Sequence, residues 1–321
     1  MQKIRAKKSL GQNFLIDEEA LRDIARSIEI WGKHIIEVGP GYGALTEYIL
    51  AHHPSTLDMV ELDGDMVQIL DERFMGEEIA PTIVWEDGAL VKTTPIALHH
   101  TDVLHFTPPY EDYSVIANIP YYITSPILFH FLYPKTPLWR PSALRLRLEE
   151  GEEPKAKGSS VSKTWEQNPS ARTSPLPFQG EFRSPQEMAI MMQEEVWEKI
   201  LAGRNKKPHH SYLSLAMELA SSDIEIVRYV GRESFDPAPK VDSIVLKFSV
   251  GNNRDREMEE RLLSLWRVAF THPRKTLMSN LKWAYSIEDI KKWMAECGYD
   301  EKIRAEAVGM EEWRNLYFAL D

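Results

Sequence analysis

The chain has 321 residues but only one cysteine, Cys297, so it cannot form a disulfide within itself. Zinc sites built from several cysteines are excluded for the same reason. Two histidine pairs, His52–His53 and His99–His100, have no third ligand at a suitable spacing. We therefore expect no metal site, and we expect a reducing compartment.

Long apolar runs are also missing. No stretch approaches the roughly 18 consecutive apolar residues of a membrane span. The first residues, "MQKIRAKKSLGQNF", are basic and contain no apolar signal core. These features predict a cytoplasmic protein without a membrane partner.

Positive charge is scarce, since the formal net charge is −11. An acidic total argues weakly against nucleic acid as a partner, because such partners usually select basic surfaces. Local clusters matter more than the sum, and any that share one face could contact phosphates. The basic residues considered for this role are Lys7, Lys8, Arg204, Lys206, Lys207, Arg274 and Lys275.

Apolar and amphipathic segments alternate along the first two thirds of the chain. Strand patterns are expected at 34–39, 57–63, 96–103, 113–119, 187–195, 224–230 and 240–250, and helical patterns at 43–53, 64–74 and 125–133. Alternation of this kind predicts an α/β fold with a mainly parallel sheet and helices on both faces.

From about residue 252 the pattern becomes entirely helical, so a domain boundary is expected near 251–253. This predicts one domain over 1–251 and a small all-helical domain over 252–321, which we expect to bind RNA. Residues 138–184 are rich in Pro, Ser, Gly and charge and lack periodicity, which is typical of a flexible insertion. The insertion should emerge at the sheet edge opposite the ligand-binding edge.

The segment "IIEVGPGYGALT" places Gly39, Gly41 and Gly43 between a predicted strand and a predicted helix. Glycines let the backbone turn sharply and let a ligand approach closely. Glu61 follows Gly39 by 22 residues, at the end of the next strand, where a carboxylate can accept hydrogen bonds from ribose hydroxyls. The G-x-G-x-G spacing favours a nucleoside ligand such as S-adenosylmethionine over NAD.

Two acids compete for the role of adenine acceptor, Asp102 in "HHTDVLHF" and Asp87 in "WEDGAL". We favour Asp102, because it precedes Asn118 by 16 residues, a suitable length for one loop and one strand. The segment "NIPYYITSP" from Asn118 to Pro126 is either a plain strand-to-helix loop or a pocket for a flat, polar ring.

Eight motifs occur in one order along the chain: "GQNFL", "EVGPGYGALT", "ELD", "NIPYYITSP", "MMQEEV", "FDPAPKVDS", "RKTL" and "IRAEAVGMEEW". In these motifs the sequence resembles the rRNA adenine N6-dimethyltransferases, and within them most of all the small-subunit (16S) enzymes. The resemblance covers nearly everything except 138–184. It implies a Rossmann-like S-adenosylmethionine-dependent methyltransferase domain followed by a small helical domain.

The resemblance also implies a reaction, a cofactor and a partner. The reaction is dimethylation of two adjacent adenines in a hairpin loop near the 3′ end of 16S rRNA, in the immature 30S subunit. Separately, we expect the protein to be a monomer. S-adenosylmethionine is the implied cofactor. Its implied ligands are Asn13, Leu15, Gly39, Gly41, Glu61, Asp102 and Asn118.

The expected chemistry centres on "NIPYY". The side-chain carbonyl of Asn118 and the main-chain carbonyl of Ile119 can accept the two hydrogens of the adenine amine and stabilise the charge that develops on it. Pro120 holds Ile119 extended. Tyr121 is expected to stack on the target base, with Phe235 as the second face.

Two alternatives remain open at this level. One is a 23S-directed methyltransferase of the Erm resistance type, and the other is a non-catalytic rRNA-binding assembly factor. Lys240, in "PKVDS", is grouped with the basic clusters as a residue expected to face RNA. In the helical domain Trp266, Trp283 and Trp293 are expected in the core.

Overall fold

The computed structural model describes most of the chain. Side chains are described in residues 7, 11–75, 94–119, 123–134, 183–202, 209–251 and 254–320, and the backbone alone in 84–86 and 89–92. Most of the expected insertion at 138–184 lies outside these residues. Within the described part, no helix is long and apolar enough to cross a membrane.

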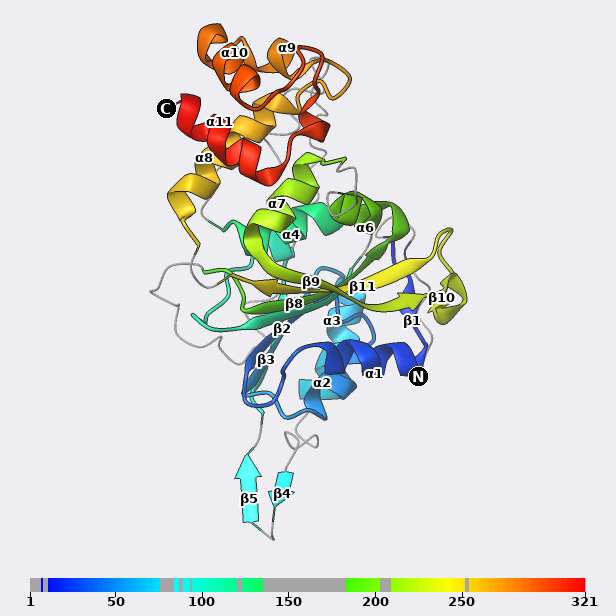
Figure 1. Cartoon of the computed structure of the whole chain (residues 1–321). Coiled ribbons are helices and arrows are strands. Elements are labelled where there is room, and N and C mark those ends of the chain that lie inside the picture. The colour runs from blue at the N-terminus through cyan, green and yellow to red at the C-terminus, as the bar shows by residue number, and fades with distance from the viewer. Residues whose placement is uncertain are drawn as a thin grey trace, which may run out of the picture.

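A seven-stranded sheet forms the centre of the molecule (Figure 1). Its strand order is β6-β3-β2-β7-β8-β11-β9, and the bounds are β2 His34–Val38, β3 Thr56–Glu61, β6 Ile96–His100, β7 Ser114–Asn118, β8 Glu187–Gln193, β9 Ser221–Val230 and β11 Ser243–Val250. Strands β6, β3, β2, β7 and β8 pair in parallel. Only β11 runs antiparallel to its neighbours β8 and β9. The predicted α/β class is confirmed.

The strands are apolar throughout because both faces of the sheet are covered. Neighbouring residues of β2 illustrate this: Ile35 packs toward α1 (Glu18–Ser27) and α2 (Ala44–Leu50), whereas Ile36 packs into the cluster on the other face. That second cluster contains α4 (Thr124–Leu132), α6 (Glu194–Leu201) and α7 (Tyr212–Ala220). Successive strand residues therefore face opposite sides, and the sheet lies between two layers of helices (Figure 1).

Four C-terminal helices lie beyond α7: α8 (Arg256–Ala269), α9 (Leu277–Leu281), α10 (Ile287–Glu296) and α11 (Met310–Leu320). Their buried side chains belong to the same hydrophobic cluster as α4 and α7. Trp266 and Trp293 are buried there, as predicted, but Trp283 is 83% exposed, so the prediction that it packs in the core is wrong. It lies in the turn after α9, whose buried face is already filled by Leu277 and Leu281.

The remaining strands are short. A two-stranded sheet joins β1 (Phe14–Leu15) to β10 (Phe235–Asp236), and a second joins β4 (Val84–Glu86) to β5 (Ala89–Lys92). Further turns of helix are α3 (Gly64–Leu70), a π-helical turn at Asp71–Met75 and 3-10 turns at Val103–His105, Arg232–Ser234 and Ala305–Ala307.

The chain leaves and re-enters the described structure at neighbouring points around the insertion. The hydroxyl of Ser184 donates to the carbonyl of Leu132, at the end of α4, over 2.9 Å. Ser184 precedes β8, so this junction lies at the amino edge of the parallel strands. The described residues that flank the insertion therefore lie away from the carboxyl edge, on the side that the sequence predicted.

A buried ion pair joins the start of the helical region to α4. Arg254 Nε and Nη2 donate to the two carboxylate oxygens of Glu259 over 2.6 and 2.8 Å, and both side chains are about 5% exposed. Arg254 Nη1 also donates to the carbonyl of Leu132 over 2.9 Å. This contact connects the helical region directly to the sheet-covering layer.

Glu259→Gln leaves the Arg254 charge buried without its counter-charge. We expect the free energy of unfolding to fall by about 3–5 kcal/mol, measured by urea denaturation. The matched control is Glu257→Gln, which breaks an exposed pair with Arg261 on the same helix and should cost less than about 0.5 kcal/mol. Equal losses in the two variants would contradict a structural role for the buried pair.

Candidate active site

Four of the predicted site residues meet at the carboxyl edge of the parallel strands. Gly39 follows β2, Glu61 ends β3, Asp102 follows β6 and Asn118 ends β7. All four line one cavity of about 250 Å³. Parallel neighbours end at the same edge, which explains why residues so distant in sequence converge.

The glycine loop forms the floor of the cavity. Gly39 and Gly41 have φ angles of 68° and 56°, in the left-handed region that other residues rarely adopt. A Cβ on Gly39 would lie 3.2 Å from the carbonyl oxygen of Asn118, and one on Gly41 would lie 3.0 Å from the Phe14 ring. Glycine is therefore required both by backbone conformation and by close neighbours.

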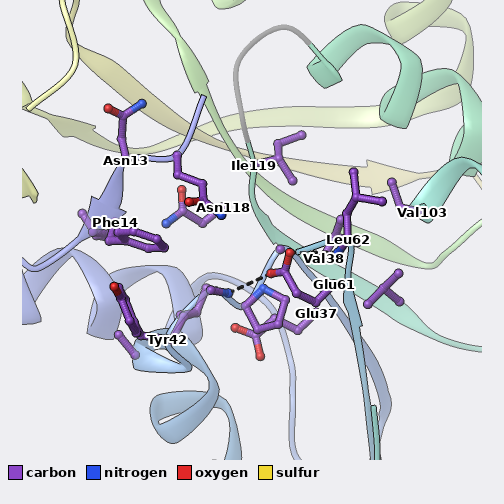
Figure 2. Close-up of a pocket in the computed structure, with 18 of the residues that line it drawn as sticks. Asn13, Phe14, Glu37, Val38, Tyr42, Glu61, Leu62, Val103, Asn118 and Ile119 are labelled. Atoms are coloured by element: carbon purple, nitrogen blue, oxygen red, sulfur yellow. Dashed lines mark hydrogen bonds between the residues drawn. The ribbon is translucent and has the colours of Figure 1, made fainter. Parts of the chain in front are cut away.

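Glu61 is held by backbone donors from two directions. Gly41 N–H donates to its Oε2 over 3.2 Å, drawn dashed in Figure 2, while Leu62 and Asp63 N–H donate to Oε1 over 2.8 and 2.9 Å. Burial raises the pKa of Glu61, although these donors oppose the effect. The geometry fixes the carboxylate next to the glycine loop.

Glu37 is a site residue to which the sequence analysis gave no role. It is 1% exposed and lines the cavity, and its Oε2 accepts a hydrogen bond of 2.7 Å from the Thr46 hydroxyl. Its Oε1 has no hydrogen-bond partner among the described residues. Burial raises the pKa of Glu37 to about 8, with a further contribution from the nearby Glu61. Glu37 lies within β2, two residues before Gly39, and its burial depends on packing that the local sequence does not show.

The N-terminal segment forms the wall opposite β3 and β6. Asn13, Phe14 and Leu15 line the cavity, with Leu62 and Val103 across from them in Figure 2. Strand β1 keeps this segment in place by pairing Leu15 with Phe235. Leu15 was predicted here, but Phe14 was missed. Its ring lies 4.4 Å, between centroids, from that of Tyr42, which is in the glycine loop and was also missed.

The predicted catalytic residues are only partly described. Asn118 and Ile119 line the cavity, whereas Pro120 and Tyr121 lie outside the described residues. Phe235 is 4% exposed, belongs to the core cluster beneath β1 and does not line the cavity. In the structure Phe235 therefore packs in the core. Its expected stacking on the target base stays a prediction.

Asp102 caps a 3-10 turn after β6, where its Oδ1 accepts from Leu104 N–H over 2.9 Å. The rival Asp87 lies outside the described residues. Asp102 thus occupies the cavity wall next to β3, as the sequence analysis favoured.

The basic residues expected to face RNA that the structure describes lie in different parts of the chain. Lys7 is engaged internally: its Nζ lies 2.5 Å from Asp63 and 2.6 Å from Asp65. Lys240 is exposed in the loop before β11, and Arg274 and Lys275 are exposed in the turn that precedes α9 rather than opening a helix. Outside the described residues lie Lys8, Arg204, Lys206 and Lys207.

In the part of the chain that the structure describes, no group of three or more His, Cys, Asp or Glu could hold a metal ion. What the cavity offers instead is two buried carboxyl groups, Glu37 and Glu61, beside a glycine loop. Such a site suits a ligand that carries hydroxyls and positive charge.

The buried Glu37 gives a testable pH dependence. An unfolded glutamate releases its proton near pH 4.5, whereas folded Glu37 keeps it until about pH 8. In this window the folded state binds more protons, so rising pH lowers the free energy of unfolding. Glu37→Gln removes this titration. Its stability relative to the wild type, measured by thermal unfolding without cofactor, should increase steadily across the window, and a pH-independent difference would contradict the assignment.

Comparison with known proteins identifies the family. The model of the ribosomal RNA adenine dimethylase family matches residues 3–321. A ribosomal RNA small subunit methyltransferase A from Mycoplasmopsis pulmonis is 29% identical over 317 residues, covering 99% of this chain and 100% of that protein. The protein of the same name from Streptococcus pyogenes serotype M3 is 32% identical over 327 residues, covering 98% of this chain and 91% of that protein.

Two solved structures share the fold. The 23S rRNA methyltransferase ErmE superimposes with a TM-score of 0.61 at 21% identity, covering 96% of this chain and 100% of that one. A dimethyladenosine transferase from Plasmodium falciparum superimposes with a TM-score of 0.60 at 19% identity, covering 94% of this chain and 95% of that one. The Rossmann-like methyltransferase fold is thereby confirmed, and by the match over nearly its whole length the chain belongs to the ribosomal RNA adenine dimethylase family.

Proposed function

We propose that the protein transfers methyl groups from S-adenosylmethionine to the N6 amines of two adjacent adenines in a 3′-terminal hairpin loop of small-subunit rRNA. The observation that carries this proposal is the convergence of Asn118 with Gly39 and Glu61 in one cavity. The names of the relatives, which are small-subunit methyltransferases, support the choice of rRNA.

The residues of the cavity fit the cofactor. Glu61 would accept from the ribose hydroxyls and Asp102 from the adenine amine, while the backbone at Gly39 and the side chain of Asn13 would face the methionine end. The unpartnered Oε1 of Glu37 gives the fit an independent basis, because a buried carboxyl oxygen without a partner can form a hydrogen bond with a bound ligand. When bound, S-adenosylmethionine supplies a methyl group on a positively charged sulfur.

Asn118 and Ile119 hold the amine that is methylated. The side-chain carbonyl of Asn118 and the main-chain carbonyl of Ile119 accept its two hydrogens, which turns the nitrogen lone pair toward the methyl donor. Fixed carbonyl dipoles then stabilise the positive charge that develops on nitrogen. Proximity and alignment contribute much of the remaining acceleration. Proton loss to water completes the transfer, since Asn118 is not a base.

The proposed base-binding and RNA-facing residues extend this site. Tyr121 would stack on the extruded adenine. Lys240, Arg274 and Lys275 are exposed and would meet phosphates. A monomer acting on the immature 30S subunit accounts for all of these roles.

The direct test uses purified protein, tritiated S-adenosylmethionine and immature 30S subunits that lack the modification, with naked 23S rRNA in parallel. The proposal expects label on two neighbouring adenines of the small-subunit RNA. Label on 23S rRNA alone would instead support the Erm type. Subunit binding without any label would support a non-catalytic assembly factor.

Asn118→Ala should separate binding from chemistry. The variant loses the acceptor that orients the amine, so methyl transfer should fall by about 100-fold or more, as for other single groups that stabilise transition-state charge. Its cofactor affinity, measured by calorimetry, should stay within about threefold of the wild type, because Glu61 and Asp102 are intact. Normal turnover by the variant would remove the proposed mechanism.

The placement of Lys7 generates a further prediction. Asp63 accepts from Lys7 Nζ over 2.5 Å and from Gln12 Nε2 over 2.7 Å, and its own N–H donates to Glu61. Although burial acts to raise it, the pKa of Asp63 is lowered by these two donors. Gln12 also lines the cavity, so Asp63 holds the N-terminal segment beside Glu61, the acid proposed to bind the ribose.

Asp63→Asn keeps the oxygen that caps α3 but removes the charge that holds Lys7. We expect about tenfold weaker cofactor binding with an unchanged rate at saturating cofactor. Asp65→Asn, at an exposed partner of the same lysine, is the matched control and should have a smaller effect. If Asp63→Asn instead bound the cofactor normally and RNA more weakly, this prediction would be contradicted and Lys7 would be assigned to RNA binding.

A further inference from the structure

Trp283 is the most exposed large hydrophobic side chain among the described residues, at 83%. The core of the helical region does not need it, because Trp266, Trp293 and Trp313 already fill that core and are at most 1% exposed. A single exposed apolar residue is common on protein surfaces and has no meaning by itself. Its surroundings decide whether it serves a ligand.

The segment that carries Trp283 is basic in a chain with a net charge of −11, and acids return only with Glu288 and Asp289 in the first turn of α10. From Arg261 to Ile287 the sequence contains five Arg and Lys residues and no Asp or Glu. Three of the cations, Arg274, Lys275 and Lys282, are exposed, and no ion pair links any of them to an acid among the described residues. A surface of this kind attracts phosphate groups.

Trp283 and the nearest cation are already in contact. The ammonium of Lys282 lies 5.1 Å from the centroid of the Trp283 ring, within the range of a cation–π interaction. Both side chains are exposed, so the pair presents an aromatic ring and a positive charge together. This combination suits an unpaired nucleotide, which offers a flat base and a phosphate.

The backbone that carries the pair is firmly held. Asn280 Nδ2 donates to the carbonyls of Ala269 and His272 over 2.7 and 3.1 Å, and Leu277 N–H donates to Ile303 over 2.8 Å. Lys282 N–H donates to the carbonyl of Met278 over 3.1 Å. A rigid platform lowers the entropic cost of binding.

We propose that Trp283 stacks on an unpaired base of ribosomal RNA, while Lys282, Arg274 and Lys275 contact the adjoining phosphates. This inference rests on the proposed function, and to the phosphate contacts proposed for Arg274 and Lys275 it adds a base contact at Trp283, outside the cavity. In Figure 1, α9 and α10 lie at the end of the molecule remote from α1 and α2, so a bound RNA would extend from the sheet edge along the helices.

The test is equilibrium binding of the full chain to immature 30S subunits over a series of salt concentrations. Trp283→Ala should weaken binding by about 5- to 150-fold, the range for loss of one base-stacking contact, with the salt dependence unchanged. Arg274→Gln combined with Lys275→Gln should instead reduce the slope of log affinity against log salt by about 0.7–1 for each lost phosphate contact.

The matched control is Trp31→Ala, which removes another exposed tryptophan, 73% exposed, from the turn between α1 and β2. It should bind as the wild type does. Trp283→Phe retains a stacking ring and should remain close to the wild type, whereas Trp283→Leu retains only apolar surface and should bind as weakly as Trp283→Ala.

Two results would overturn the inference: wild-type affinity in Trp283→Ala, or equal affinity in the Phe and Leu variants, which would indicate an apolar protein contact. If the wild type itself transfers no methyl to the subunits, the proposed function fails. If it does and Trp283→Ala binds normally, only this inference fails.

Discussion

The close approach of the glycine loop to the end of β7 is the constraint on which the rest of the site depends. A side chain on Gly39 would lie 3.2 Å from the carbonyl oxygen of Asn118, so the two loops meet only because Gly39 lacks one. The parallel pairing of β2 with β7 brings them to the same edge. In the proposed function this contact places the methyl donor and the acceptor amine in one cavity.

Charge is distributed unevenly: buried acids line the cavity proposed for the cofactor, and exposed cations lie on the surface proposed for RNA. Buried carboxyl groups, Glu37 and Glu61, line the cavity, where burial raises their pKa and a bound cation would favour their charged form. The exposed cations near α9 lie in a different part of the chain, free of acids from Arg261 to Ile287. An acidic total is therefore compatible with an RNA substrate, because the binding surface is local.

Much of the fold could be predicted from sequence, because strands buried on both faces are continuous apolar runs and glycines mark the loop between β2 and α2. Glu61, Asp102 and Asn118 were found for the same reason: each follows such a run. Glu37 was overlooked because burial of an acid in a strand depends on packing that only the fold reveals. Trp283 was misjudged because the completeness of a helical core is not visible from local pattern. The ion pair between Lys7 and Asp63 could not be predicted either, because the two residues are far apart in sequence.

The most direct measurement of the central claim is mass spectrometry of nucleosides from 16S rRNA. The rRNA would come from cells that lack this modification and produce the chain. The account predicts that N6,N6-dimethyladenosine appears at two adjacent positions of the 3′-terminal hairpin. A folded, ribosome-associated protein that leaves these adenines unmodified would contradict it.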